Sequence, residues 1–129
     1  MASSSKKTTK QKSLSKASIS KLPTELMILS STWKVSYLDN VYDVGDLAGN
    51  REDPVFGLCD YVKREITIYV GGRDIIDVWK TLIHEILHAL SDSLALHSFM
   101  KFKDHEQIVD ALSNGLVDTI VRNDLKVGR

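Results

Sequence analysis

Residues 81–90 read TLIHEILHAL, and this stretch decides both the fold and the chemistry that the sequence predicts. His84 and His88 are four residues apart, so on an α-helix their directions differ by only about 40°. Both imidazoles can then reach one zinc ion at about 2.0–2.1 Å. Glu85 lies beside them, where it can accept a proton from the water that the zinc binds. The pattern therefore predicts a helix that carries two metal ligands and a general base.

The residues around this stretch predict that the helix is long and begins near Asp74. The carboxylate of Asp74 can accept hydrogen bonds from free backbone N–H groups, and its charge complements the positive end of a helix. Apolar side chains recur at helical spacing through the segment, at Ile75, Trp79, Leu82, Ile83, Ile86 and Leu90. One face of the helix should therefore pack against the rest of the domain.

A second long helix is predicted near the C-terminus. It should begin at Asp104, because Gln107 follows three residues later and forms a capping-box-like pair with it. Residues 91–103 connect the two helices, with a short helical piece expected around residues 94–99. The apolar stripe of the last helix is expected to consist of Ile108, Val109, Leu112, Leu116, Val117 and Ile120.

Strand-like stretches precede the first of these helices. Residues 33–38 alternate apolar with more polar side chains, which is the period of a half-buried strand. Residues 39–54 are rich in Asp, Gly and Asn and are expected to form a loop. Residues 55–61 and 66–70 predict a hairpin of two strands that ends in a Gly-Gly pair. The predicted fold is a small α+β domain, in which a short antiparallel sheet packs on the histidine-bearing helix and on a C-terminal helix.

The charge distribution separates a basic tail from an acidic body. The chain carries 17 basic and 17 acidic residues, yet six lysines fall within the first 21 residues, which hold no acidic residue. Residues 1–20 are rich in Ser, Thr and Lys and cannot bury enough apolar surface to fold, so we expect a disordered tail. Residues 21–129 are expected to form a single domain. Its first helix should begin near Leu22, because Pro23 suits a first helical turn.

Composition also limits the compartment and the partners of the protein. The single cysteine, Cys59, excludes an intramolecular disulfide and a multi-cysteine zinc finger, and it suits a reducing compartment. No apolar run approaches the roughly 18 residues that a membrane span requires, and the N-terminus lacks the apolar core of a secretory signal. We therefore expect a cytoplasmic protein with no membrane partner. Contact with nucleic acid is expected only through the lysines of the tail, and the oligomeric state does not follow from the sequence.

Two histidines leave a catalytic zinc ion short of a third protein ligand. The downstream candidates are Asp92, His97, Asp104, His105, Glu106 and Asp110. Glu106 is favoured because Asp110 lies four residues later on the same helical face. The carboxylate of Glu106 can bind zinc while Asp110 accepts a hydrogen bond from the far nitrogen of a ligating histidine and so fixes its tautomer. One such set of ligands predicts one zinc ion per chain.

The order of these residues resembles that of the gluzincin clan of zinc peptidases, in which HExxH precedes a glutamate ligand on a later helix. Here Glu106-x-x-x-Asp110 follows His88 by 18 residues. The small size, the E-x-x-x-D-A-L of residues 106–112 and the hairpin with Gly57 and ITIYV are similar to the ImmA/IrrE family of minimal gluzincins. The resemblance covers about residues 55–121. It implies an intracellular zinc endopeptidase, with Glu85 as general base, that cleaves a protein substrate such as a DNA-binding regulator.

Two other interpretations stay open. A SprT-like DNA-associated metalloprotease would take its third zinc ligand from His105, and the basic tail would suit it. A zinc-stabilised, non-catalytic domain would bind a partner without cutting it, although Glu85 argues for catalysis. A metzincin is excluded, because Ser91 and Leu94 stand where that group requires Gly and His.

Some roles are assigned less specifically by the sequence. The side chains that could polarise the tetrahedral intermediate are Tyr61, Tyr69 and Arg122. Residues 66–70, if they border the cleft, could pair with an extended substrate through backbone hydrogen bonds. His97 is expected to be a surface or packing residue.

Overall fold

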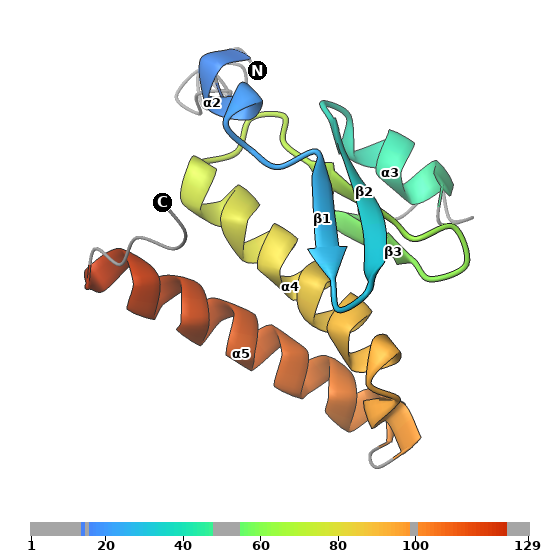
Figure 1. The fold of residues 1–129 in the computed structure, drawn as a ribbon. Helices are drawn as coiled ribbons and strands as arrows, with labels where there is room; N and C mark the ends of the chain where they lie inside the picture. Colours follow the sequence, from blue (N-terminus) through green and yellow to red (C-terminus); the bar gives the residue numbers. More distant parts are fainter. Residues whose placement is uncertain (1–13, 15, 48–54, 99–100, 124–129) are drawn as a thin grey trace, which may run out of the picture.

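Four strands form one mixed sheet in the order β1-β2-β4-β3 in the computed structural model, which describes residues 14, 16–47, 55–98 and 101–123 (Figure 1). Antiparallel pairs join β1 (Glu25–Ile28) to β2 (Ser31–Leu38) and β3 (Gly57–Asp60) to β4 (Glu65–Tyr69). The central pair, β2 and β4, is parallel. The predicted hairpin is therefore confirmed, whereas the prediction of a wholly antiparallel sheet was wrong.

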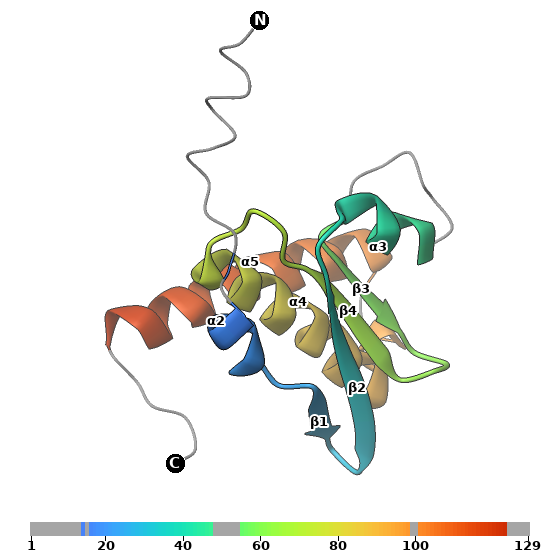
Figure 2. The same ribbon diagram turned by 90° about the horizontal axis from the view of Figure 1, so that it is seen from above.

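The core lies between one face of the sheet and helix α4 (Ile75–Ser93). Alternation along the strands directs one set of side chains to this face, because successive residues of a strand point to opposite sides. The most deeply buried members are Trp33, Val35, Ile66, Ile68, Val70, Val78, Leu82 and Ala89. The alternation predicted for residues 33–38 is thus confirmed. On the other face, helix α3 (Val41–Leu47) packs against β2 and β4, where a loop was expected (Figure 2).

Helix α4 begins as the sequence predicts. The Oδ1 atom of Asp74 accepts a hydrogen bond from the backbone N–H of Ile76 at 3.2 Å, so Asp74 is the N-cap. Leu82 and Ala89 are fully buried in the core with the sheet, and four further residues of the predicted stripe pack against that core, namely Ile75, Trp79, Ile86 and Leu90. Within the described residues, no helix combines the length and the apolar character needed to cross a membrane.

Helix α5 (Phe102–Arg122) runs back along α4 on the side away from the sheet (Figures 1 and 2). A short 3-10 turn, η1 (Leu96–Ser98), precedes it, as expected. Lys101 is the N-cap and makes no side-chain capping bond, so the predicted start at Asp104 with a capping box was wrong. The buried seam of α5 consists of His105, Val109, Ser113 and Val117.

The apolar stripe predicted for α5 is only partly correct. Val109 and Val117 are buried, but Ile108, Leu112 and Leu116 are about half exposed. Spacings of three and four residues allow two adjacent stripes on one helix. The seam that faces α4 is the one beside Glu106, and it includes the small polar Ser113. The prediction of the stripe did not take into account that Glu106 must point towards α4.

The N-terminal part of the described chain differs from the prediction. A helix was expected near Leu22, but the chain forms β1 there, with Leu26 and Ile28 turned inward. Four residues are too few to show a period, and pairing with β2 decides the conformation. Helix α2 (Lys16–Ser20) falls within the predicted tail, and Leu14 and Ile19 pack against the core. The preceding residues, 1–13, lie outside the described residues.

Candidate metal centre

His84, His88 and Glu106 bring three ligand atoms together between α4 and α5. His84 Nε2 lies 3.1 Å from His88 Nε2 and 3.1 Å from Glu106 Oε1. The third side of the triangle, from His88 Nε2 to Glu106 Oε1, measures 3.2 Å. Among the described residues, these three form the one group of His, Cys, Asp or Glu side chains that could hold a metal ion. The structure thus brings together the three residues that the sequence analysis names as metal ligands.

The spacing of the three atoms fits a metal ion. Hydrogen bonds alone cannot account for all three short contacts. A neutral imidazole carries a proton on only one of its nitrogens, and that N–H points in one direction. Ligands bound at about 2.0–2.1 Å to a tetrahedral ion lie about 3.3–3.4 Å apart, close to the observed 3.1–3.2 Å. Two imidazoles and one carboxylate are also a common ligand set for divalent transition metals.

Two helices position the three ligands. His84 and His88 are one turn apart on α4, on the side that faces α5 rather than the sheet. Glu106 lies in the first turns of α5, so the reversal of the chain between the helices brings its carboxylate over the two imidazoles. Burial of the opposite side of α4, at Leu82 and Ala89, fixes the rotation of the helix and hence the direction of both rings.

Glu85 is buried beneath β3, next to the ligands. Glu85 is only 7 % exposed. Burial raises the pKa of Glu85 to about 8, and the negative charge of Glu106 adds to the rise. A divalent cation bound beside it would favour the charged form and so lower this pKa again. The pKa of Glu85 therefore lies near neutral pH, which is the range that suits a general base.

Gly57 allows Glu85 to lie this close to the sheet. A Cβ atom at position 57 would be 2.7 Å from Glu85 Oε2 and 2.7 Å from Thr81 Cγ2. Both distances are shorter than side-chain atoms tolerate without displacement. Strand β3 can therefore approach α4 at this point only because residue 57 has no side chain.

Asp110 lies behind His84, as the sequence predicts. Its Oδ1 atom is 3.6 Å from His84 Nδ1, the nitrogen that faces away from the ligand point. That distance is longer than a hydrogen bond but close enough for an attractive interaction with the ring. The side chain of Asp110 is 69 % exposed. The structure thus brings the pair together but shows a looser contact than the predicted hydrogen bond.

His105 does not belong to the ligand group. It is buried, and its ring packs edge-on against the ring of His88 with 5.2 Å between centroids. Glu106 belongs to the gluzincin-like interpretation and His105 to the SprT-like one, and the described structure brings Glu106 and not His105 to the two helix histidines. The sequence offered His105 only as an alternative third ligand and gave no sign of its contact with His88.

A cavity of about 1490 Å³ extends from the ligand point along α4. Tyr61 and Tyr69 line it, as does Arg73. Burial, with the negative charges around it, raises the pKa of Tyr61, so its hydroxyl keeps its proton and can donate a hydrogen bond. Arg122, the third residue suggested by the sequence for polarising an intermediate, bonds Asp118 at 2.8 Å and does not line this cavity. The side chain of His97 lies outside the described residues.

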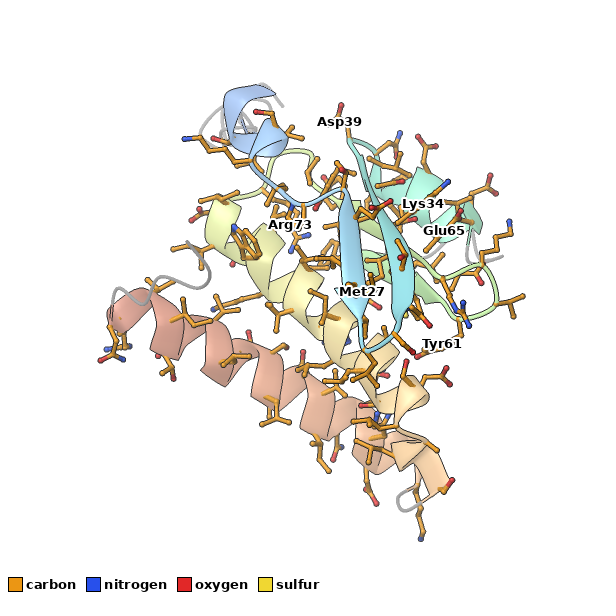
Figure 3. All side chains as sticks on the ribbon, viewed as in Figure 1. Met27, Lys34, Asp39, Tyr61, Glu65 and Arg73 are labelled. Carbon is orange, nitrogen blue, oxygen red and sulfur yellow. The ribbon has the colours of Figure 1, made fainter. Side chains whose placement is uncertain are left out.

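Arg73 is a cavity residue that the sequence analysis missed. Its guanidinium donates hydrogen bonds to the carbonyl oxygens of Tyr69 and Asp77 and to Thr81 Oγ1. Its central carbon lies 5.0 Å from the ring centroid of Phe56. Figure 3 shows Arg73 towards the N-terminal end of α4 and Tyr61 towards the other end. An arginine directly before the N-cap of α4 was the one available signal in the sequence.

The edge strand beside the cavity is β3. Residues 66–70 were considered for pairing with a substrate, but β4 is internal, with β2 and β3 on its two sides. Gly57, Leu58 and Cys59 of β3 line the cavity. Burial, with smaller contributions from Glu85 and Asp92, raises the pKa of Cys59 to about 12, so the thiol keeps its proton. Cys59 is therefore part of the cavity wall and a poor metal ligand.

The centre as a whole combines three converging ligand atoms, a buried carboxyl group and an adjoining cavity bordered by an edge strand. Such an arrangement can hold a metal ion and, next to it, a second molecule. No family model matches this chain, and neither a curated protein nor a solved structure is significantly similar to it.

Proposed function

We propose that this protein is a zinc-dependent endopeptidase of the minimal gluzincin type, with one zinc ion held by His84, His88 and Glu106. The observation that carries the proposal is the approach of their ligand atoms to within 3.1–3.2 Å of one another beside the buried Glu85. Structural zinc sites are usually closed by four protein ligands, whereas catalytic sites keep one position open. The three ligands found here among the described residues fit the second kind.

Each residue of the centre then has a chemical task. Zinc, when bound, would polarise the scissile carbonyl and lower the pKa of a water molecule. Glu85 accepts the proton of the attacking water and passes it to the leaving amine. Asp110, whose Oδ1 atom lies 3.6 Å from the far nitrogen of His84, would help to orient that ring, and Tyr61, which lines the cavity, would donate a hydrogen bond to the carbonyl oxygen. A gluzincin-like order of HExxH and a later glutamate supports the same assignment.

The cavity supports a peptide as the substrate. Strand β3 borders it and pairs on only one side among the described strands. An extended peptide can add to such an edge through backbone hydrogen bonds, which are independent of its sequence. We propose an intracellular protein substrate, and the family resemblance suggests a DNA-binding regulator.

The decisive experiment compares the wild type with Glu85→Gln. The variant keeps the shape of the side chain and both imidazoles but removes the base. Zinc content, measured by elemental analysis after supplementation and dialysis, should be about one ion per chain in both proteins. A peptide library prepared from a bacterial proteome should be cleaved by the wild type alone.

Two outcomes would contradict the proposal in different ways. A wild type without bound metal would remove the metal centre. Zinc in both proteins with no cleavage of any peptide would instead support the non-catalytic binding domain. Glu106→Ala and His105→Ala complete the comparison, because a SprT-like site would lose zinc with His105→Ala and keep it with Glu106→Ala.

A further inference from the structure

Two buried nitrogen atoms without a hydrogen-bond partner lie behind the metal centre. Three buried side-chain nitrogen or oxygen atoms of the described residues have no partner, and two of them are His88 Nδ1 and His105 Nε2. The third, Trp33 Nε1, belongs to the sheet. His88 is 7 % and His105 8 % exposed, and their rings are in edge-on contact at 5.2 Å and 67°. The two nitrogens therefore occur in one pair of touching rings.

An unpaired buried polar atom is costly, and native structures rarely keep one without a reason. Under the proposed function, it is the Nδ1 atom of His88 that needs a hydrogen-bond partner. If the Nε2 atom of His88 faces a metal ion, its lone pair is used there, and the ring proton must be on Nδ1. That N–H then requires an acceptor, because the site is closed to bulk solvent.

We propose that His105 is a positioning residue that accepts the Nδ1–H hydrogen bond of His88 through one buried water molecule, since the two nitrogens are not bonded to each other directly. In the tautomer with its proton on Nδ1, the Nε2 atom of His105 has the free lone pair that this bond needs. A partner of this kind fixes the tautomer and the orientation of a ligating imidazole. This inference rests on the proposed metal site.

The arrangement accounts for the adjacent positions of His105 and Glu106 in the sequence. Neighbouring positions on a helix point about 100° apart, so Glu106 can reach the front of His88 while His105 lies against its back. Asp110 is placed behind His84 in the corresponding way. Helix α5 thus supplies one ligand and a supporting residue for each histidine of α4.

The test replaces His105 by two residues of opposite hydrogen-bonding capacity. His105→Leu keeps an apolar side chain in the buried position but offers no acceptor. His105→Gln carries a carbonyl oxygen at a reach similar to Nε2. Zinc affinity, measured by competition with a chromophoric chelator, should fall about 10–100-fold in the leucine variant, the usual loss for such a partner. The glutamine variant should recover most of that loss.

Unfolding of the metal-free proteins separates this role from simple packing. Replacing a buried imidazole that lacks a partner by an apolar side chain is expected to leave stability unchanged or higher. In His105→Leu, zinc affinity should therefore fall while the stability of the metal-free protein does not. In the zinc-loaded wild type, nitrogen-15 NMR should show a slowly exchanging Nδ1–H of His88, and this signal should be lost in the leucine variant.

Each result decides between the possibilities. Equal zinc affinity in the wild type and His105→Leu would overturn the inference while leaving the metal site intact. Parallel losses of stability and affinity, with no recovery in His105→Gln, would show that His105 only packs. A wild type that binds no zinc would overturn the proposed function and this inference with it. The predicted affinities without peptide cleavage would leave the inference standing and reject the peptidase alone.

Discussion

At the scale of single residues, burial shifts the pKa of Glu85 so far that its carboxyl group titrates near neutral pH. Burial places its pKa at about 8, against 4.5 for the free group. Between these values the folded protein holds a proton that the unfolded chain releases. The stability that this protonated carboxyl contributes is complete below the unfolded pKa and is lost as the pH rises through the folded one.

We therefore expect the metal-free protein to lose stability as the pH rises from about 6.5 to 8. His88 does not contribute in this window. Burial lowers the pKa of His88 from 6.5, so its titration affects stability only below that pH. The free energy of unfolding should be measured by urea titration at several pH values. Glu85→Gln has no carboxyl group to titrate, so the slope in this window should disappear in that variant. An unchanged slope would show that Glu85 does not titrate as its burial implies.

Asp110 is predicted to contribute to zinc affinity much less than Glu106. Glu106→Ala removes a ligand atom and should nearly abolish zinc binding. Asp110→Ala removes an exposed carboxylate 3.6 Å from His84, so the loss should be about tenfold, the lower end for a supporting partner. Competition titrations on both variants test this order. Equal losses would place Asp110 on the metal itself.

At the scale of secondary-structure elements, the close approach of β3 to α4 depends on Gly57. In Gly57→Ala the added Cβ meets Thr81 and Glu85 at 2.7 Å, and we expect a loss of about 1–3 kcal/mol in the free energy of unfolding. Cleavage should fall further than zinc binding, because Glu85 is displaced while the ligands are not.

A matched substitution controls for the change from glycine to alanine. A Cβ atom at Gly115, in the middle of α5, would meet no atom within 4 Å. Gly115→Ala should therefore stabilise the protein by about 0.5–1 kcal/mol, the helix preference of alanine over glycine. Chemical denaturation of both variants gives the comparison. A loss at both positions would mean that contact with Glu85 is not what restricts residue 57.

The elements also show what could be predicted from the sequence. Helix α4 was predicted with its cap because a long segment repeats its period several times and Asp74 marks its start. Strand β1 was mistaken for a helix, because its four residues show no period and its partner β2 decides its structure. His84, Glu85 and His88 were predicted because HExxH fixes their spacing on one helix, and Glu106 was predicted because Asp110 follows it four residues later. The role of His105 depends on the packing of two helices, which no local pattern encodes.

At the scale of the whole molecule, the N-terminal segment can be divided by truncation. Leu14 and Ile19 pack against the core, and Leu14 and Ser18 border the cavity. Deletion of residues 1–13 should leave the melting temperature and zinc content unchanged. Deletion of residues 1–20 removes partly buried apolar side chains and should lower the free energy of unfolding by about 1–2 kcal/mol. Calorimetry on both truncations checks this, and identical melting temperatures would place the domain boundary after α2.

Helix α5 packs mainly on one other element in the described part of the chain, which is α4, through a seam of two valines, a serine and a histidine. Only two of these four buried side chains are apolar, so burial of apolar surface by the seam alone contributes little to holding a helix of 21 residues. A metal ion shared between the histidines of α4 and Glu106 of α5 would fasten the two helices to each other. The supply of metal would then set how often the C-terminal end detaches and becomes accessible to degradation. For a cell short of zinc, the outcome would be a shorter lifetime of the protein rather than a store of intact, inactive molecules.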